Sequence, residues 1–344
     1  AGFPDQAYKE AGVEVLGERS EVFQKSDVLL QVRGLGANPE GYEADLELAR
    51  DGQLLVGMMD PRGSPDPLED AAGHNLSVVA MELIPRISRA QSMDVLSSQA
   101  NLGGYKAVLM AARDSPRVFP MMMTAAGTIQ PARVFVIGAG VAGLQAIATA
   151  QRLGAEVRGY DIRLEVKEQV ESLGADFVEL DLETEEAEGE SGYARAMDET
   201  FYEEQRRKMA EVLSETDVCV TTAAIPGQEA PLLVTEEGLE GMPPGSQVVD
   251  LAASTGGNCA VTEPGETIEY AGVTVKGPLN LPSTIPYHAS KLYANNLTAF
   301  LTSVLEEGEL HFDPEDEVVD SVLLIEDGDF RNDDETNSSE SDAE

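Results

Sequence analysis

The strongest constraint on the fold of this chain is a β-branched run that leads directly into a glycine-rich hexapeptide. Residues 133–137 read RVFVI, residues 138–143 read GAGVAG, and a helical pattern follows over residues 144–153. In such a strand, turn and helix, the first glycine allows a tight turn and the second lets the backbone approach a pyrophosphate. The third lets the helix pack closely on the strand, and the helix amides face the phosphate charge. The predicted pyrophosphate site comprises Gly138, Gly140, Val141, Ala142 and Gly143.

A carboxylate after the next predicted strand completes this dinucleotide signature. The strand covers residues 156–160 and is followed by Asp161, which lies 21 residues after Gly140. That spacing places the carboxylate where it can accept hydrogen bonds from both hydroxyls of an adenosine ribose. Its charge repels a 2′-phosphate and so favours NAD over NADP, although Arg163 nearby weakens that preference. We expect Asp161, Ile162 and Arg163 to contact the adenosine end of the cofactor.

Short apolar runs alternate with helix-length segments along most of the chain. They lie at residues 27–32, 53–58, 133–137, 156–160, 217–221, 247–251 and 273–275. The stretch 88–112 holds helix formers and no proline, which predicts a helix before the RVFVI strand. This alternation predicts an α/β fold with two Rossmann-like doubly wound domains and parallel sheets.

The length of 344 residues fits two domains. We expect residues 98–287 to form the NAD-binding Rossmann domain and residues 1–97 with 288–330 to form an outer, substrate-domain-like α/β domain. Residues 331–344, which end in NDDETNSSESDAE, are expected to be a disordered acidic tail because they hold too little apolar surface to bury.

Acidic residues outnumber basic ones by 63 to 23, which gives a net charge of −40. Residues 306–344 contribute 17 acids and one arginine, so the remainder still carries about −24. This charge disfavours duplex nucleic acid as a partner. Repulsion of this size is tolerated best where high salt screens it, so the composition predicts a halophilic, cytosolic protein.

The two cysteines, Cys219 and Cys259, stand outside any cysteine or histidine cluster. We therefore expect no metal site. Apolar stretches are interrupted well before the roughly 18 residues that a membrane helix needs. We expect no direct membrane insertion.

The residues that could carry out chemistry beside a nicotinamide are unusual. The three histidines, His74, His288 and His311, are each more typical of structural or exposed positions than of an acid–base role. Residues 86–105, RISRAQSMDVLSSQANLGGY, instead offer polar groups that can hydrogen-bond an amide and a ribose. Hydride transfer between two nicotinamides needs close approach but no proton transfer, so such groups suffice. A polar helix cap and helix surface would explain the same residues.

A charged segment, ELDLETEEAEGE at residues 179–190, precedes SGYAR at 191–195. It fits either a solvated loop or a functional lid, and the residues alone do not separate the two.

Six segments together carry a resemblance to a known family. They read RISRAQSMDVLSSQANLGGYKAV, GAGVAGLQAIATAQRLGAEVRGYDIR, KEQVESLGADF, SGYARAMDETFYEEQ, VVDLAASTGGNCAVTEPGE and GPLNLPSTIPYHASKLYANNL. They are similar to the NAD(H)-binding component of proton-translocating NAD(P) transhydrogenase, in the alanine dehydrogenase/transhydrogenase family. The resemblance implies an oxidoreductase that binds NAD(H) and transfers hydride between NADH and NADP⁺ held on a partner subunit. Membrane-spanning subunits of that family move protons.

The resemblance also implies roles for individual residues. Arg86 would lie near the nicotinamide and the pyrophosphate, and Gln91 would lie between the two nucleotides. Asp94 and Ser97 would hold the carboxamide of NADH, and Tyr193 would belong to a mobile loop that closes over the site. The glycines of the hexapeptide would serve the pyrophosphate, as the turn itself predicts.

The family resemblance further implies a homodimer that works with membrane-spanning and NADP-binding subunits. It places the chain in the cytoplasm, peripheral to the inner face of the cell membrane. Two departures from the family stand out. A longer N-terminal stretch is usual, so we expect the first domain to lack its N-terminal part, and Ser254 stands where the family usually has Glu. An NAD-dependent alanine dehydrogenase and a non-catalytic NAD-binding module remain alternatives.

Overall fold

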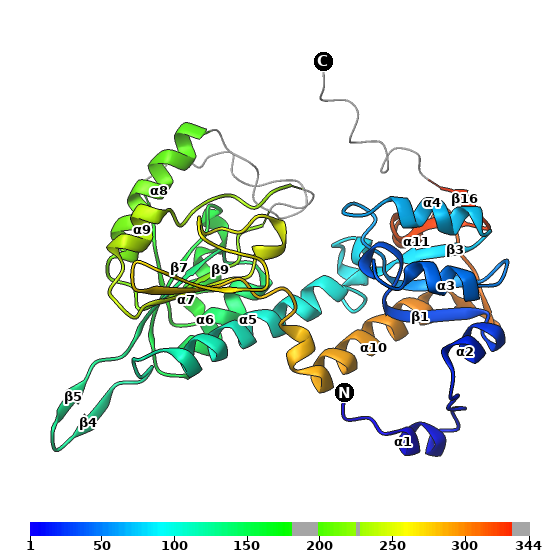
Figure 1. The fold of residues 1–344 in the computed structure, drawn as a ribbon, viewed down its shortest axis with the longest axis horizontal. Helices are drawn as coiled ribbons and strands as arrows, with labels where there is room; N and C mark the ends of the chain where they lie inside the picture. The colour runs from blue at the N-terminus through cyan, green and yellow to red at the C-terminus, as the bar shows by residue number, and fades with distance from the viewer. Residues whose placement is uncertain (181–198, 225–227, 332–344) are drawn as a thin grey trace. The chain divides into compact units, whose positions relative to one another are not determined.

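The computed structural model describes residues 1–180, 199–224 and 228–331. The chain divides into two compact units, one of Ala1–Ser98 with Pro286–Glu344 and the other of Gln99–Ile285 (Figure 1). The first unit is thus built from both ends of the chain, whereas the second is one continuous stretch. Each unit has its own sheet and its own apolar core.

The sheet of the second unit has seven strands within the described residues, in the order β11-β12-β10-β9-β6-β7-β8. All neighbours are parallel except β11, which pairs antiparallel with β12. From β8 to β12 this is the strand order of a dinucleotide-binding Rossmann fold, with its switch point between β6 and β9. The strands are β6 (Arg133–Ile137), β7 (Glu156–Tyr160), β8 (Asp176–Phe177), β9 (Val218–Thr221), β10 (Gln247–Asp250), β11 (Thr267–Tyr270) and β12 (Val273–Lys276).

Helices cover both faces of this sheet because alternate side chains of each strand point to opposite sides. On one face, Val134 and Val136 of β6 pack in a cluster with residues of α5, α6 and α7. On the other face, Phe135 and Ile137 pack with residues of α8 and α9. The helices are α5 (Val95–Asp114), α6 (Val141–Arg152), α7 (Lys167–Ser172), α8 (Glu199–Leu213) and α9 (Glu236–Gly241), with 3-10 turns η4 (Leu164–Val166), η5 (Ala253–Thr255) and η6 (Pro282–Thr284).

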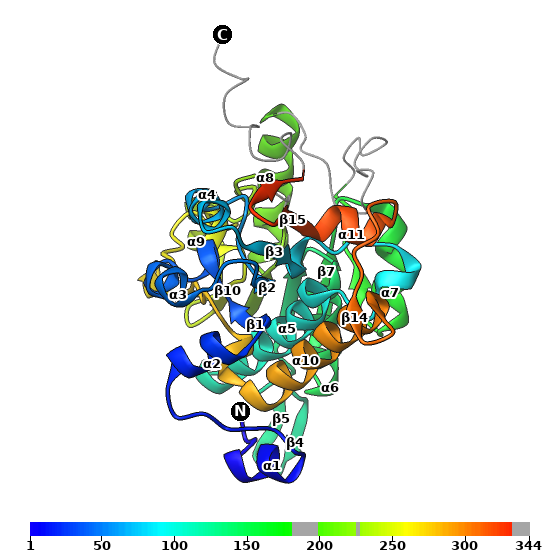
Figure 2. The same ribbon diagram turned by 90° about the vertical axis from the view of Figure 1, so that its right-hand side faces the viewer.

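The sheet of the first unit has the order β1-β2-β3-β15-β16 (Figure 2). Strands β1 (Val28–Arg33), β2 (Leu54–Met58) and β3 (Ser77–Ala80) are parallel. Strands β15 (Leu323–Glu326) and β16 (Asp329–Phe330) are antiparallel additions at the edge of β3. The predicted α/β fold class is therefore confirmed, and antiparallel strands border each of the two mainly parallel sheets.

The first unit also buries both faces of its sheet. Val56 and Val79 pack in a cluster with Tyr293 and Phe300 of α10, and the opposite face packs against α2, α3 and α4. The helices are α1 (Asp5–Glu10), α2 (Arg19–Lys25), α3 (Tyr42–Leu48), α4 (Asp66–Gly73), α10 (Pro286–Ser303) and α11 (Glu317–Val322). Short elements are η1 (Leu35–Ala37), η2 (Met81–Leu83), η3 (Ser88–Ala90), β13 (Leu305–Glu306) and β14 (Glu309–Leu310).

The seven apolar runs of the sequence each form a strand, but the helix predicted over residues 88–112 begins later. A 3-10 turn covers Ser88–Ala90, and α5 starts at Val95. Asp94 sets this start, because its Oδ1 accepts the Ser97 amide at 2.8 Å and its Oδ2 accepts the Ser97 hydroxyl at 2.6 Å. A side-chain cap of this kind satisfies an amide in the first helical turn and fixes the helix boundary.

A two-stranded hairpin extends away from the body of the second unit (Figure 1). It consists of β4 (Met122–Thr124) and β5 (Gly127–Ile129), whose residues are all exposed. Methionine side chains cover this region, and Met123 is 83% exposed. An isolated hairpin with exposed apolar residues is stable only when something else covers it.

The C-terminal end of α5 is fixed to the sheet by a charged network. The Lys276 ammonium, 8% exposed, donates to Asp114 Oδ2 at 2.6 Å and to Gln247 Oε1 at 2.8 Å. Hydrogen bonds from Arg113 and Lys276 hold the pKa of Asp114 well below its ordinary value of 3.8.

A carboxyl group whose pKa is lower in the folded than in the unfolded state stabilises the fold above the unfolded value and loses that contribution as the pH falls. We therefore expect Asp114→Asn to lower the melting temperature at pH 7 and to have a much smaller effect near pH 2. Melting curves of both proteins across this range measure the difference. Arg113→Ala serves as the control, since Arg113 is largely exposed and should matter less than the buried Lys276. A gap between wild type and Asp114→Asn that stays constant with pH would contradict the linkage.

No helix in the described ranges is long and apolar enough to cross a membrane. Those ranges also contain no group of three or more His, Cys, Asp or Glu side chains that could hold a metal ion.

Candidate dinucleotide site

The glycine-rich turn lies at the carboxyl end of β6, beside the switch point of the sheet. Gly138 has φ +95°, a conformation that side chains with a Cβ rarely adopt. A Cβ on Gly143 would lie 1.8 Å from the Gly138 carbonyl oxygen, so this helix position admits only glycine. Steric demands within the fold therefore account for two of the three glycines.

Gly140 is different, because a Cβ built there would meet no atom within 4 Å. The fold itself does not require glycine at this position. The open space above the Gly140 backbone is what a bound pyrophosphate needs in order to come close. The turn thus has a cradle that a side chain would fill, and its residues fit a dinucleotide.

The amino terminus of α6 faces the same turn. Gly140 is the N-cap of this 12-residue helix, and no side chain caps it. The first amides of a helix have no partner within the helix and carry partial positive charge. Val141 and Ala142 belong to this first turn, so their amides can donate to an anion held over Gly140.

Asp161 follows β7 and lies against the glycine-rich turn. Its side chain is buried, at 6% exposure. Oδ2 accepts the Ala139 amide at 2.7 Å, and Oδ1 accepts the Arg163 amide at 2.9 Å. The Arg163 guanidinium also pairs with the carboxylate, from Nε to Oδ1 and from Nη2 to Oδ2, both at 2.9 Å. Ile162 between them is buried. The structure thus brings Asp161 and Arg163 together with the turn that sequence analysis linked to them.

Sequence analysis missed a second buried carboxylate, Asp250, at the end of β10. It is 0% exposed and accepts five hydrogen bonds. Asn258 in turn connects two loops, since its side chain bonds the Ala223 amide and the Ala223 and Pro231 carbonyls. These contacts fix the loops that follow β9 and β10 at the same edge of the sheet as the glycine turn. An aspartate directly after the VV of a predicted strand was the only signal. The donors to Asp250 are Thr221 Oγ1, Thr262 Oγ1 and the amides of Ala252, Asn258 and Cys259.

The predicted nicotinamide residues Arg86, Gln91, Asp94 and Ser97 all belong to the first unit. Arg86 and Gln91 are exposed, and Asp94 and Ser97 bond to each other as described for the start of α5. This placement fits the helix-cap explanation of Asp94 and Ser97, and it leaves their predicted role toward the carboxamide as a proposal.

A buried asparagine holds this segment from the neighbouring helix. The Asn296 amide of α10 donates to the Ser92 carbonyl at 2.8 Å, and the Ser98 hydroxyl donates to Asn296 Oδ1 at 2.8 Å. Asn296 was not singled out by sequence analysis, although it lies in the last of the six family segments. It fixes the backbone on both sides of Asp94.

Tyr193 lies outside the described residues, as do residues 181–190 of the charged segment and residues 332–344 of the acidic tail.

The reactive side chains elsewhere do not form a catalytic centre within the described residues. His74, His288 and His311 are all exposed. Cys219 and Cys259 are buried, and burial raises the pKa of Cys219 well above its ordinary value and that of Cys259 to about 11. A thiol with so high a pKa is not a nucleophile at neutral pH.

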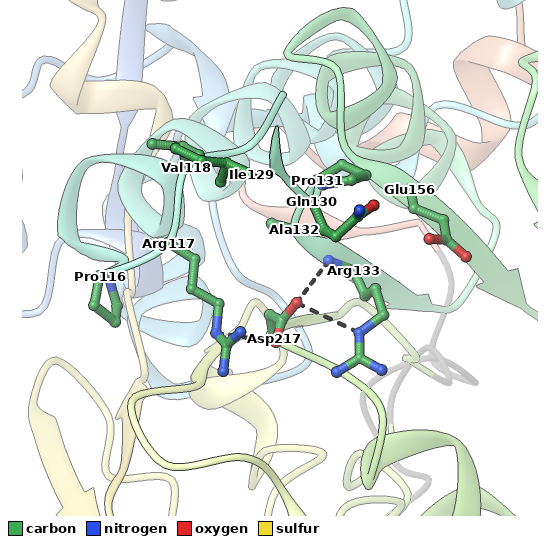
Figure 3. A pocket seen from close by; sticks show the side chains of 10 residues that line it. All are labelled: Pro116, Arg117, Val118, Ile129, Gln130, Pro131, Ala132, Arg133, Glu156 and Asp217. Carbon is green, nitrogen blue, oxygen red and sulfur yellow. Dashed lines mark hydrogen bonds and ion pairs between the residues drawn. The ribbon is translucent and has the colours of Figure 1, made fainter. Parts of the chain in front are cut away.

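A hollow of about 620 Å³ lies at the opposite, amino-terminal edge of the sheet (Figure 3). At its floor the buried Asp217 accepts the Arg133 amide at 2.9 Å and pairs with Arg117 Nε at 3.2 Å. Ligands of open α/β sheets bind at the carboxyl ends of the strands, so this hollow is not the dinucleotide site. Its lining residues are Pro116, Arg117, Val118, Ile129, Gln130, Pro131, Ala132, Arg133, Glu156 and Asp217.

Strand order, glycine turn, uncapped helix and buried aspartate together define a Rossmann-type dinucleotide-binding protein. Two family models match almost the whole chain. The model of the N-terminal domain of alanine dehydrogenase/PNT matches residues 1–103, and that of the C-terminal domain matches residues 107–333. The chain belongs to the alanine dehydrogenase/PNT family.

Within this family the chain is more similar to transhydrogenase subunits than to alanine dehydrogenases. It is 44% identical to the first of the polypeptides that make up the NAD(P) transhydrogenase alpha subunit of Rickettsia prowazekii, over 95% of this chain and 84% of that protein. The corresponding protein of Rhodospirillum rubrum is also 44% identical, over 95% and 86%. The alanine dehydrogenase of Bacillus subtilis is only 22% identical, over 90% of this chain and 75% of that protein. The predicted transhydrogenase resemblance is confirmed.

Solved structures agree with this relationship. The structure of transhydrogenase from Sinorhizobium meliloti matches with a TM-score of 0.82 and 45% identity, covering 95% of this chain and 87% of that one. A structure of L-alanine dehydrogenase matches with a TM-score of 0.78, covering 97% and 86%, but at 22% identity it shows the shared fold alone.

Proposed function

We propose that this chain is the NAD(H)-binding component of a proton-translocating NAD(P)⁺ transhydrogenase. It takes part in hydride transfer between its own NAD(H) and NADP(H) bound on a partner subunit. The observation that carries this proposal is the glycine turn, in which Gly138 and Gly143 are required by the fold while Gly140 faces open space beside Asp161. The similarity to transhydrogenase subunits, far above that to alanine dehydrogenases, supports the choice of reaction.

Nicotinamide supplies the hydride chemistry when it is bound, and the residues of the chain bind and orient it. The amides at the start of α6 hold the pyrophosphate, and Asp161 accepts the hydroxyls of the adenosine ribose. We assign Arg86 to the nicotinamide and pyrophosphate end, and Asp94 with Ser97 to the carboxamide. Tyr193 closes over the site in this scheme.

Direct transfer between two nicotinamides moves no proton onto carbon, so the reaction requires no acid–base residue. The exposed positions of His74, His288 and His311 suit this chemistry. Alanine dehydrogenase chemistry, in contrast, requires proton transfer to and from the substrate amine and a cationic clamp for its carboxylate. The test is to supply NADH with an NADP analogue and the partner subunits, and separately with pyruvate and ammonium. Hydride transfer only in the first mixture supports the proposal, and alanine formation in the second contradicts it. Cofactor binding without either reaction would favour a non-catalytic module.

We assign Gln91 to orienting the two nicotinamides. Shortening it to asparagine keeps the amide and withdraws it by one methylene, which affects a geometry needed only in the transition state. We expect Gln91→Asn to slow hydride transfer by about tenfold or more in the reconstituted complex and to leave NADH affinity nearly unchanged. Stopped-flow transfer and equilibrium titration measure the two effects. Weaker NADH binding with an unchanged transfer step would reduce Gln91 to a binding residue.

The proposed partners are the NADP-binding and membrane-spanning transhydrogenase subunits, together with a second copy of this chain. The exposed methionines of the β4–β5 hairpin offer an apolar surface for such a homodimer. Through its partners the chain would lie at the inner face of the cell membrane, on the cytoplasmic side.

We further propose that the protein is halophilic, because a net charge of −40 repels itself until salt screens it. Melting temperatures that rise steeply toward molar potassium chloride would support this, and flat or falling values would contradict it.

A further inference from the structure

We propose that Arg163 competes with the adenosine ribose for Asp161 and must release that carboxylate before the nucleotide can bind fully. The inference rests on the proposed NAD(H)-binding function. It assigns Arg163 the role of an internal occupant of the ribose site that sets nucleotide affinity.

The argument begins with the number of hydrogen bonds that Asp161 can accept. An ionised carboxylate has about four acceptor positions, two on each oxygen. Oδ1 accepts from the backbone amide and from Nε of Arg163, and Oδ2 accepts from the Ala139 amide and from Nη2 of Arg163. These four donors fill the acceptor positions. The hydroxyls of a ribose would find no place on this carboxylate as it stands.

Two of the four donors cannot leave. The Ala139 amide belongs to a turn whose preceding residue, Gly138, bonds the Tyr160 carbonyl at 2.8 Å, and Ala139 is itself 1% exposed. The Arg163 amide is part of the backbone that follows β7. These contacts keep Asp161 in place whether or not a nucleotide is bound.

The other two donors are on a side chain with several rotatable bonds. The guanidinium of Arg163 is 14% exposed, so it has a route to water. Its Nε and Nη2 occupy one position on each carboxylate oxygen, and the 2′- and 3′-hydroxyls of a ribose need two such positions. Exchange of the guanidinium for the two hydroxyls keeps every acceptor of Asp161 satisfied.

The exchange has a cost, since charge-assisted, two-pronged hydrogen bonds are stronger than those to neutral hydroxyls. Arg163 therefore lowers the affinity for any nucleotide whose ribose uses Asp161. A carrier that must exchange its cofactor in every turnover gains faster release from this competition.

The experiment compares two probes, ADP and 2′,3′-dideoxy-ADP, which differ only in the ribose hydroxyls. Isothermal calorimetry measures their binding to the full chain, wild type and Arg163→Ala. We expect Arg163→Ala to bind ADP about tenfold more tightly than wild type does, since loss of one charge-assisted pair is of that order. The dideoxy probe has no hydroxyls to compete with, so its affinity should be the same in both proteins.

Arg158→Ala is the matched control, because Arg158 lies on β7 and pairs with the exposed Glu215 instead of with Asp161. It should change neither affinity. Arg163→Gln is a second variant that keeps most of the stem but cannot occupy both oxygens, and it should show a gain similar to that of Arg163→Ala. Melting curves verify that each variant is folded.

Unchanged or weaker ADP binding in both folded Arg163 variants would overturn the inference, and so would an equal gain for the dideoxy probe. Tight ADP binding by wild type with no gain in the variants would leave the proposed NAD(H) function standing. Failure of every protein to bind ADP or NADH would instead overturn the proposed function, and the inference with it.

Discussion

Replacing Gly143 with alanine is expected to destabilise the protein by about 3 kcal/mol, because the fold leaves no room for a methyl group there. The added Cβ would lie 1.8 Å from the Gly138 oxygen and 2.8 Å from its carbonyl carbon. Both contacts are to backbone atoms, so no side-chain movement relieves them. Either α6 or the glycine turn must shift, and nucleotide binding should be lost as well. Denaturant unfolding and NADH titration measure the two effects.

Gly140→Ala is the matched control with the opposite profile. Its Cβ would meet nothing within 4 Å, so the unfolding free energy should change by less than about 1 kcal/mol, the usual range for an N-cap substitution. The methyl group would instead stand where the pyrophosphate approaches, and NADH affinity should fall by about tenfold or more. A Gly140→Ala protein that binds NADH normally would show that the open space over this residue serves some other purpose.

The second large effect is expected at Asp250. Asn has the same shape but replaces one acceptor oxygen with an NH₂ group. Oδ1 faces the Thr221 hydroxyl and the Ala252 amide, and Oδ2 faces two backbone amides and the Thr262 hydroxyl. Whichever way the new amide turns, its NH₂ group opposes at least one buried backbone donor. We expect Asp250→Asn to destabilise the protein by about 3 kcal/mol.

Thr262→Val is the control for Asp250, since it removes a single hydroxyl donor and leaves the carboxylate in place. Its cost should be about 1 kcal/mol. Chemical unfolding of both variants beside wild type gives the comparison. If Asp250→Asn were no more destabilising than Thr262→Val, the loops after β9 and β10 would owe their position to packing and not to this carboxylate.

Local patterns were enough to predict the pyrophosphate turn and most of the parallel strands. RVFVI followed by GAGVAG is decisive because strand, turn and helix are adjacent in sequence, and each glycine has a separate steric or ligand-related reason. The β-branched runs were recognisable because strands buried on both faces are almost wholly apolar. The start of α5 was placed too early, because a composition rich in helix formers gives no warning that Asp94 will cap a later turn.

The rest depends on residues that meet only after folding. β15 is four residues in an acidic stretch, and it is a strand because Leu323 and Ile325 pair with β3 across more than two-thirds of the chain. The network of Asp250 and the anchoring by Asn296 likewise join distant segments. The pairing of Asp161 with Arg163 is close in sequence, yet it depends on a turn that directs both side chains to one side. Sequence spacing indicated the ribose acceptor but not its present occupant.

Because β15 completes a sheet begun by β1, β2 and β3, the two ends of the chain have to meet before the first unit is whole. On the ribosome, the strands from β6 to β12 emerge before β15 does. The continuous second unit can therefore complete its core while the first unit still lacks α10, α11 and its antiparallel edge. Until then the edge of β3 has unpaired backbone groups, which are an open template for another chain. The late pairing of β15 is thus both the final step of assembly and the point at which the nascent chain stops being vulnerable to aggregation.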